Sequence, residues 1–158
     1  LAVLKSLSKP DGYMNISIYS EVARPHLVAA QDFVKKEGYK PTIEDIRKAR
    51  QVIIDHPNKL IQECLTASDF FTTSQCRDLI FHVQEHRFTL DQIKDILKRH
   101  DLIFDGFFNY KKYEIDQFTK RFSEKDAILD IEKWKIFEQE NPAFFKNKMY
   151  NFRVKHAT

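Results

Sequence analysis

The chain has 158 residues, of which 42% are hydrophobic and 31% charged, and its net charge is +3. This length suits one domain with a substantial core, and the composition excludes a disordered chain. Basic residues are scattered among acidic ones, and no apolar run approaches the ~18 residues of a membrane helix. We therefore expect neither a nucleic-acid nor a membrane partner. Cys64 and Cys76 lack metal-ligand spacing and are typical of the reducing cytoplasm.

The first quarter of the chain predicts a helix end, a strand and a second helix. Apolar residues in Leu1–Leu7 have helical spacing, which indicates the tail of a helix whose beginning is missing. Ser8–Gly12 is a turn, and strict alternation over 14–18 is typical of a strand. A further helix should begin near Pro25 and end near Gly38, since glycine favours helix C-termini.

The remaining elements are mostly helical. Helices are expected at 43–53, 60–65, 73–83, 89–99, 113–122 and 128–138, and strands at 102–108 and 149–155. Thr89 and Gln92 form the best capping box, whereas Ser123 and Asp126 are expected to open the helix over 128–138. The sequence thus predicts a helix-rich α/β chain with about three strands. Such a sheet forms an incomplete layer unless another segment completes it.

Only three glycines are present, at positions 12, 38 and 106. They are too far apart for a phosphate-cradling loop or a G-x-G-x-x-G fingerprint. A nucleotide-type cofactor site of the usual sort is therefore not expected in this chain.

Several segments carry a resemblance to a known family. The turn at 7–14 is similar to the "lkPgG" turn of class I S-adenosylmethionine-dependent methyltransferases, and 105–107 is similar to their late "aGF". A narrower resemblance is to a bacterial group of these enzymes often fused to tetratricopeptide repeats. It is carried by four segments, at 18–24, 68–79, 81–89 and 137–142.

This resemblance implies a single partial methyltransferase domain over residues 1–158, namely the C-terminal part of a Rossmann-like sheet with a helical insert at 25–87. The last two strands would form a reversed pair, and the insert would supply the acceptor side of the site. The glycine-rich loop and ribose-binding acid of such enzymes lie upstream. S-adenosylmethionine is therefore expected as cofactor of the full-length protein, with none bound to this chain. The expected partner is the missing N-terminal half, and the exposed sheet edge favours homo-oligomers.

Two polar clusters are candidate substrate-binding sites. Tyr19, Ser20 and Glu21 follow the first strand, where Glu21 could accept a proton; alternatively, Ser20 and Glu21 cap the next helix. The second cluster comprises His82, Glu85, His86 and Arg87. It either lines a substrate pocket or forms a salt-bridged helix end.

Two alternatives come from other functional classes. His82, Glu85 and His86 match H-x-x-E-H, which on a helix would place two histidines on one face for a zinc hydrolase. The aromatic content of 13% and the scarcity of glycine are instead compatible with a non-catalytic helical interaction module.

Overall fold

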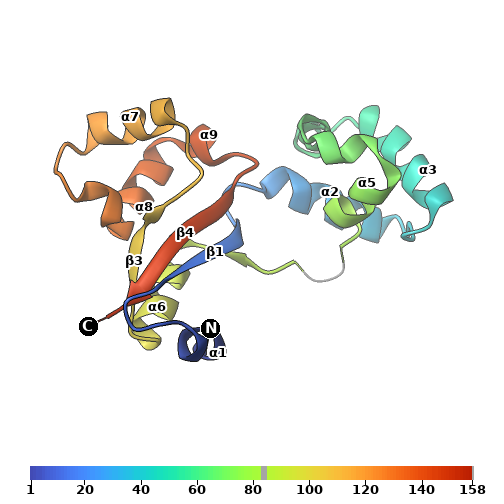
Figure 1. Ribbon diagram of the computed structural model, residues 1–158. Coiled ribbons are helices and arrows are strands. Elements are labelled where there is room, and N and C mark those ends of the chain that lie inside the picture. Colours follow the sequence, from blue (N-terminus) through green and yellow to red (C-terminus); the bar gives the residue numbers. More distant parts are fainter. Residues whose placement is uncertain (83–84, 158) are drawn as a thin grey trace. The chain divides into compact units, whose positions relative to one another are not determined.

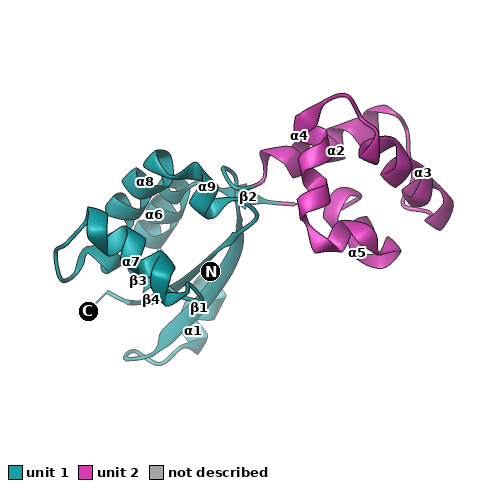
Figure 2. Cartoon of the chain, turned by 90° about the horizontal axis from the view of Figure 1, so that it is seen from above, with its two compact units in different colours: residues 1–23, 86–158 teal, residues 24–85 magenta. Residues whose placement is uncertain are grey.

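The chain folds into two compact units, which Figure 2 distinguishes by colour. Unit 1 comprises residues 1–23 and 86–158, and unit 2 comprises residues 24–85. The computed structural model describes residues 1–82 and 85–157. Each unit has a hydrophobic core of its own.

A mixed four-stranded sheet forms the centre of unit 1 (Figure 1). Its strands are β1 (Tyr13–Ser20), β2 (Arg87–Phe88), β3 (Leu102–Phe107) and β4 (Met149–His156), in the order β2-β1-β4-β3. β4 is antiparallel to both β1 and β3, so that β1 and β3 run in the same direction. The chain therefore has an α/β fold, and its last two strands are a reversed pair.

The expectation of about three strands is wrong by one. β2 has only two residues, and it pairs in parallel with Tyr19 and Ser20. Two residues are too few to show the alternation by which a strand is recognised, and this pairing is made by residues far apart in the sequence.

Helices pack on one face of the described part of this sheet. Met14, Ile16 and Ile18 lie opposite Val154, Phe152 and Tyr150, and these side chains join the core. The core is completed by residues of α6 (Leu90–Arg99), α7 (Lys112–Arg121), α8 (Ile131–Glu140) and α9 (Pro142–Phe145), whereas α1 (Ala2–Leu7) has no buried residue.

The opposite face of the sheet is polar. Arg153 and Lys155 form ion pairs with Asp105 there, at 2.8 and 3.1 Å, and the Tyr13 side chain is exposed. A doubly wound sheet has helices on both faces. The described part of unit 1 is thus a two-layer α/β structure.

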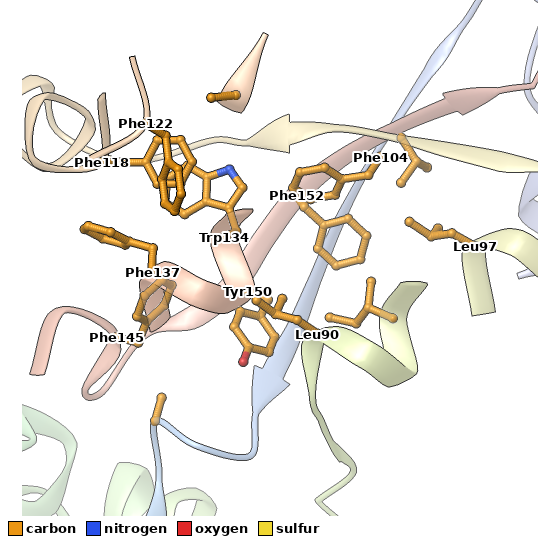
Figure 3. Packing of buried hydrophobic residues seen from close by; sticks show 14 of the residues in the cluster. Leu90, Leu97, Phe104, Phe118, Phe122, Trp134, Phe137, Phe145, Tyr150 and Phe152 are labelled. Atoms are coloured by element: carbon orange, nitrogen blue, oxygen red, sulfur yellow. The ribbon is translucent and has the colours of Figure 1, made fainter. Parts of the chain in front are cut away.

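Aromatic rings fill the core of unit 1 (Figure 3). The rings of Phe118 and Trp134 are stacked with their centroids 3.8 Å apart, and Phe137 meets both edge-on. The Trp134 indole donates a hydrogen bond of 2.9 Å to the Ile128 carbonyl, so that its polar atom is satisfied inside the core. The aromatic load seen in the sequence is therefore largely a packing feature.

Unit 2 is helical. It comprises α2 (Pro25–Lys36), α3 (Ile43–Ile54), α4 (Lys59–Gln62) and α5 (Thr73–Ile80), with 3₁₀ turns at Glu63–Thr66 and Ser68–Phe71. Side chains of Thr42, Asn58 and Thr72 cap the three later helices. α2 ends before Gly38, whose φ of 75° is in the left-handed region that glycine adopts without a steric penalty.

Two helix boundaries differ from those expected. The helix expected at 128–138 is split into a 3₁₀ turn, Ala127–Leu129, and α8, which is capped by Asp130 rather than by Ser123 or Asp126. The Asp130 carboxylate accepts a hydrogen bond from the Glu132 backbone N–H at 2.9 Å, which stabilises the helix start. The helix expected at 73–83 ends at Ile80, and Val83 lies outside the described residues.

None of the helices in the described part of the chain has both the length and the apolar character required to cross a bilayer.

The capping box of α6 gives a first test of the fold. The Thr89 hydroxyl accepts a hydrogen bond from the Gln92 backbone N–H at 3.3 Å, and the Gln92 side chain accepts one from the Thr89 N–H at 2.9 Å. We expect Thr89→Ala to lower the free energy of unfolding by about 1 kcal/mol. Denaturant titration followed by Trp134 fluorescence measures this loss.

Thr119→Ala is the matched control. The Thr119 hydroxyl only donates to carbonyls within α7, so its removal should change stability by about 0.5 kcal/mol or less. Equal losses in the two variants would contradict the assignment of the box.

Candidate functional site

The end of the unit 1 sheet formed by Ser20, Phe107 and Met149 is termed here the carboxyl edge, because the parallel strands β1 and β3 end there. Ligands of open α/β sheets bind beyond the carboxyl ends of strands. Tyr19 and Ser20 lie at this edge, and the Glu21 backbone N–H donates to the Phe88 carbonyl at 3.0 Å. The structure thus brings Tyr19, Ser20 and Glu21 together with β2.

The three side chains differ in their surroundings. Ser20 is buried, and its hydroxyl accepts a hydrogen bond of 3.2 Å from the Ala23 backbone N–H, whereas Glu21 is exposed. Ser20 therefore stabilises the turn after β1. It is not the N-cap of α2, since that position is held by Arg24.

A buried carboxyl group lies behind Ser20. Glu138 of α8 is 7% exposed and accepts a hydrogen bond of 2.5 Å from the Tyr150 hydroxyl, which also has Ser20 as a hydrogen-bonding neighbour. Burial raises the pKa of Glu138 to about 7, although the Tyr150 hydrogen bond acts in the opposite direction. The chain Ser20–Tyr150–Glu138 can thus hold or release a proton near neutral pH.

Sequence reasoning did not single out Glu138. A signal was present, because Glu138 follows Trp134 by four residues and so shares the buried face of α8. An acidic residue on an apolar helix stripe is unusual and indicates a polar partner in the core.

Two adjoining clefts share the side chains of Tyr113, Glu114 and Lys148. One, of about 510 Å³, lies at the carboxyl edge just after β3, and the other, of about 610 Å³, is lined by residues of α7 and α9. Tyr110, with the amides of Asn109 and Asn151, contributes to the first. None of the substrate-binding residues expected from the sequence lines either cleft.

Lys148 is held by an acidic and aromatic environment. Its ammonium forms an ion pair with Glu114 and lies 4.0 Å from the Phe144 ring centroid and 4.9 Å from that of Tyr110. Burial alone would raise the pKa of Glu114, but hydrogen bonds from Lys148 and the Lys111 backbone lower it below its ordinary value. The Tyr110 hydroxyl is buried and has no hydrogen-bond partner among the described residues. Aromatic walls with a few polar groups are typical of small-molecule sites.

The cluster His82, Glu85, His86 and Arg87 is divided between the two units. His82 and Glu85 belong to unit 2, whereas His86 and Arg87 belong to unit 1, where Arg87 pairs with Tyr19 in β2. Gln84 lies outside the described residues, as does Val83.

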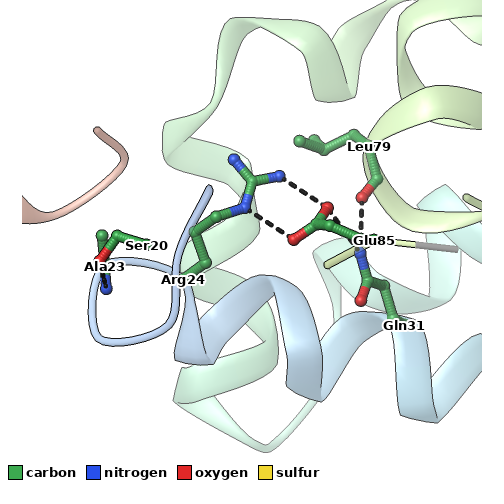
Figure 4. Close-up of polar contacts among 6 residues, drawn as sticks. All are labelled: Ser20, Ala23, Arg24, Gln31, Leu79 and Glu85. Carbon is green, nitrogen blue, oxygen red and sulfur yellow. Dashed lines mark hydrogen bonds and ion pairs between the residues drawn. The ribbon is translucent and has the colours of Figure 1, made fainter. Parts of the chain in front are cut away.

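Glu85 is engaged within unit 2 (Figure 4). Its oxygens accept hydrogen bonds from Arg24 Nε and Nη2 at 3.0 and 3.1 Å, and the side chains of both residues are less than a tenth exposed. Gln31 bridges this pair to the Leu79 carbonyl at 3.1 Å. Glu85 thus forms an ion pair with Arg24, and neither Glu85 nor Arg87 lies in a helix.

Neither His82 nor His86 lies in a helix, although zinc binding by H-x-x-E-H would require both on one helical face. α5 ends at Ile80, before His82, and the chain at His86 leads into β2. The described residues contain no cluster of three or more histidine, cysteine or acidic side chains that could hold a metal ion.

No protein-family model matches this chain, and a search of curated proteins finds no significant match.

The raised pKa of Glu138 should make the stability of the chain depend on pH. The folded chain keeps the proton on Glu138 up to about pH 7, whereas the unfolded chain releases it near 4.5. Folding therefore favours proton binding in this window, and the Glu138 contribution makes stability fall as pH rises from 4.5 to 7. We expect the wild-type minus Glu138→Gln difference in unfolding free energy to decline across this window by at most about 3 kcal/mol. Denaturant titrations at several pH values measure it.

Glu140→Gln provides the contrast. The hydrogen bond from Arg121 lowers the pKa of Glu140, so its contribution is present above 4.5 and is lost only as pH falls through lower values. A flat difference curve for Glu138→Gln would exclude a raised pKa.

We expect the effects of substituting Arg24 and Glu85 on the free energy of unfolding to be strongly coupled. Arg24→Leu alone leaves a carboxylate buried without its guanidinium and should destabilise the chain by about 3–5 kcal/mol. The double variant Arg24→Leu/Glu85→Leu should lose less than the sum of the single variants. A double-mutant cycle by denaturation followed by circular dichroism checks this, and additive losses would rule out the coupling.

Proposed function

We propose that this chain is the C-terminal portion of an S-adenosylmethionine-dependent methyltransferase of the cytoplasm and contributes the acceptor side of its active site. The carboxyl edge is the observation that carries the proposal. There, two parallel strands end beside a reversed strand, next to the clefts and a carboxyl group that titrates near neutral pH. This arrangement supports the resemblance in the turn at 7–14 and in Asp105–Phe107.

The clefts are suited to an acceptor that combines a flat apolar part with polar groups. Tyr110, Tyr113 and Phe144 offer ring surfaces, and the asparagine amides offer both donors and acceptors. Methyl transfer depends chiefly on positioning the nucleophile against the sulfonium carbon. Glu138, Tyr150 and Ser20 line neither cleft, so Glu138 would act as a positioning group by fixing β4 beside the end of β1.

The cofactor side would be supplied by another part of the full protein. Beyond the two pairs with β2, the described residues leave the outer edge of β1 unpaired from Tyr13 to Ile18. A strand added there would extend the sheet towards the Rossmann-like arrangement that the resemblance implies. The three dispersed glycines leave this chain without a glycine-rich cofactor loop.

Isothermal titration calorimetry with S-adenosylhomocysteine tests the proposal. The two samples are this chain and a longer polypeptide that includes the in-frame coding sequence upstream of Leu1. We expect saturable binding by the longer polypeptide and no measurable binding by the chain alone, because the cofactor loop would be present only in the former.

Two outcomes would contradict the proposal in different ways. Tight binding by the chain alone would refute the division of cofactor and acceptor sides. A folded longer polypeptide that neither binds S-adenosylhomocysteine nor transfers a methyl group would remove the methyltransferase assignment.

A non-catalytic interaction module is the second candidate. It is favoured by unit 2, which has a self-contained core around Ile46, Ile53 and Phe70. If unit 2 acts in this way, residues 24–85 expressed alone should remain folded with a cooperative thermal transition.

A further inference from the structure

A hollow lies at the end of the unit 1 sheet opposite the carboxyl edge. It has a volume of about 480 Å³, and its wall includes Lys5, Ser8, Arg99, His100, Asp101 and His156. These residues come from α1, the end of α6, the turn before β3 and the end of β4. Segments distant in the sequence thus place four nitrogen-bearing side chains around one space.

The hydroxyl of Ser8 fixes His156 in this wall. Ser8 Oγ lies 2.8 Å from the Lys5 carbonyl, to which it donates, and 2.6 Å from His156 Nε2. Because the single hydroxyl proton is used on the carbonyl, the short contact is made by an N–H of the imidazole. That N–H is taken up by Ser8, which holds the His156 ring in the wall of the hollow.

Positive charge exceeds negative charge in the hollow. Among the described residues of the wall, Lys5 and Arg99 are cations, and Asp101 is the one acidic residue. Lys5 Nζ lies 3.5 Å from Asp101 Oδ2, but the Asp101 side chain is 79% exposed. Such an exposed pair contributes little to stability, so that Lys5 can exchange Asp101 for a more highly charged anion.

Helix capping explains single cations of this cluster but not their convergence. Basic residues are favoured at a helix C-terminus, and Lys5 lies in the last turn of α1 as Arg99 does in that of α6. That preference does not bring the ends of two different helices to one hollow, nor does it place His156 of β4 there.

We propose that this hollow binds the phosphate group of a small phosphorylated ligand. Lys5 and Arg99 supply the charge-assisted hydrogen bonds that phosphate oxygens accept, and the imidazole of His100 lies in the same wall. A small ligand is favoured over a nucleic acid because the hollow is local, and the other basic residues are scattered among acidic ones. This proposal is independent of the proposed methyltransferase function.

Amide NMR of the ¹⁵N-labelled chain, titrated with inorganic phosphate and then with glycerol phosphate, tests the proposal. We expect saturable shifts in the signals of residues 5–8, 99–101 and 156. Lys5→Ala and Arg99→Ala should each weaken binding by about tenfold, since each removes a charged hydrogen-bond donor.

Lys98→Ala is the matched control, because it removes one charge from the same turn of α6 without touching the hollow. It should change affinity by less than about twofold. The proposal would be overturned if Lys98→Ala weakened phosphate binding as much as Lys5→Ala or Arg99→Ala. It would also be overturned if the folded wild-type chain showed no saturable shift. Tighter binding of a single-stranded oligonucleotide, with shifts spread beyond the hollow, would replace the small ligand with a nucleic acid.

His156→Gln separates binding from folding. Its amide spectrum reports whether the fold is retained after the Ser8 contact is altered. A folded variant that binds phosphate as tightly as the wild-type chain would contradict the role of His156 in the hollow.

Discussion

The antiparallel ladder between β1 and β4 is the constraint on which the rest of unit 1 depends. Seven residue pairs join Tyr13–Tyr19 to Met149–Lys155, so the two ends of the chain are held in one register. A shift by one residue would turn Ile16 and Phe152 out of the aromatic core. The same ladder places Ser20 near Tyr150 and His156 near Ser8, so that both candidate sites depend on it.

What the sequence predicted well was local. The alternation over 14–18 and the Thr89–Gln92 box involve neighbours along the chain, and β1 and the capping box were both confirmed. β2 was missed because its two residues exist as a strand only through pairing with β1. The partner of Glu85 was also beyond sequence reasoning, since Arg24 lies 61 residues away and meets it only in the folded unit. Whether these residues belong to a methyltransferase remains a proposal.

The two carboxylates that matter most in this chain illustrate how packing decides chemistry. Glu138 is buried with a hydroxyl partner, which leaves its pKa raised to about 7, whereas hydrogen bonds from Lys148 and the Lys111 backbone lower the pKa of Glu114. Glu138 can therefore bind and release a proton near pH 7, whereas Glu114 stays a carboxylate at that pH. The place of Glu138 on the apolar face of α8 is visible in the sequence, whereas its partner Tyr150 and the Lys148 partner of Glu114 come from β4 and the segment before it.

The two ends of the sheet carry different chemistry, and β4 connects them. It begins beside the aromatic clefts at Met149 and ends at the cationic hollow with His156. Coupling between two sites requires an element with two discrete arrangements that both ligands bias. β4 is paired on both sides, and its inward side chains are locked in an aromatic core, so a change of register would expose that core. A ligand at one end should therefore leave affinity at the other end unchanged, and the two sites should act independently.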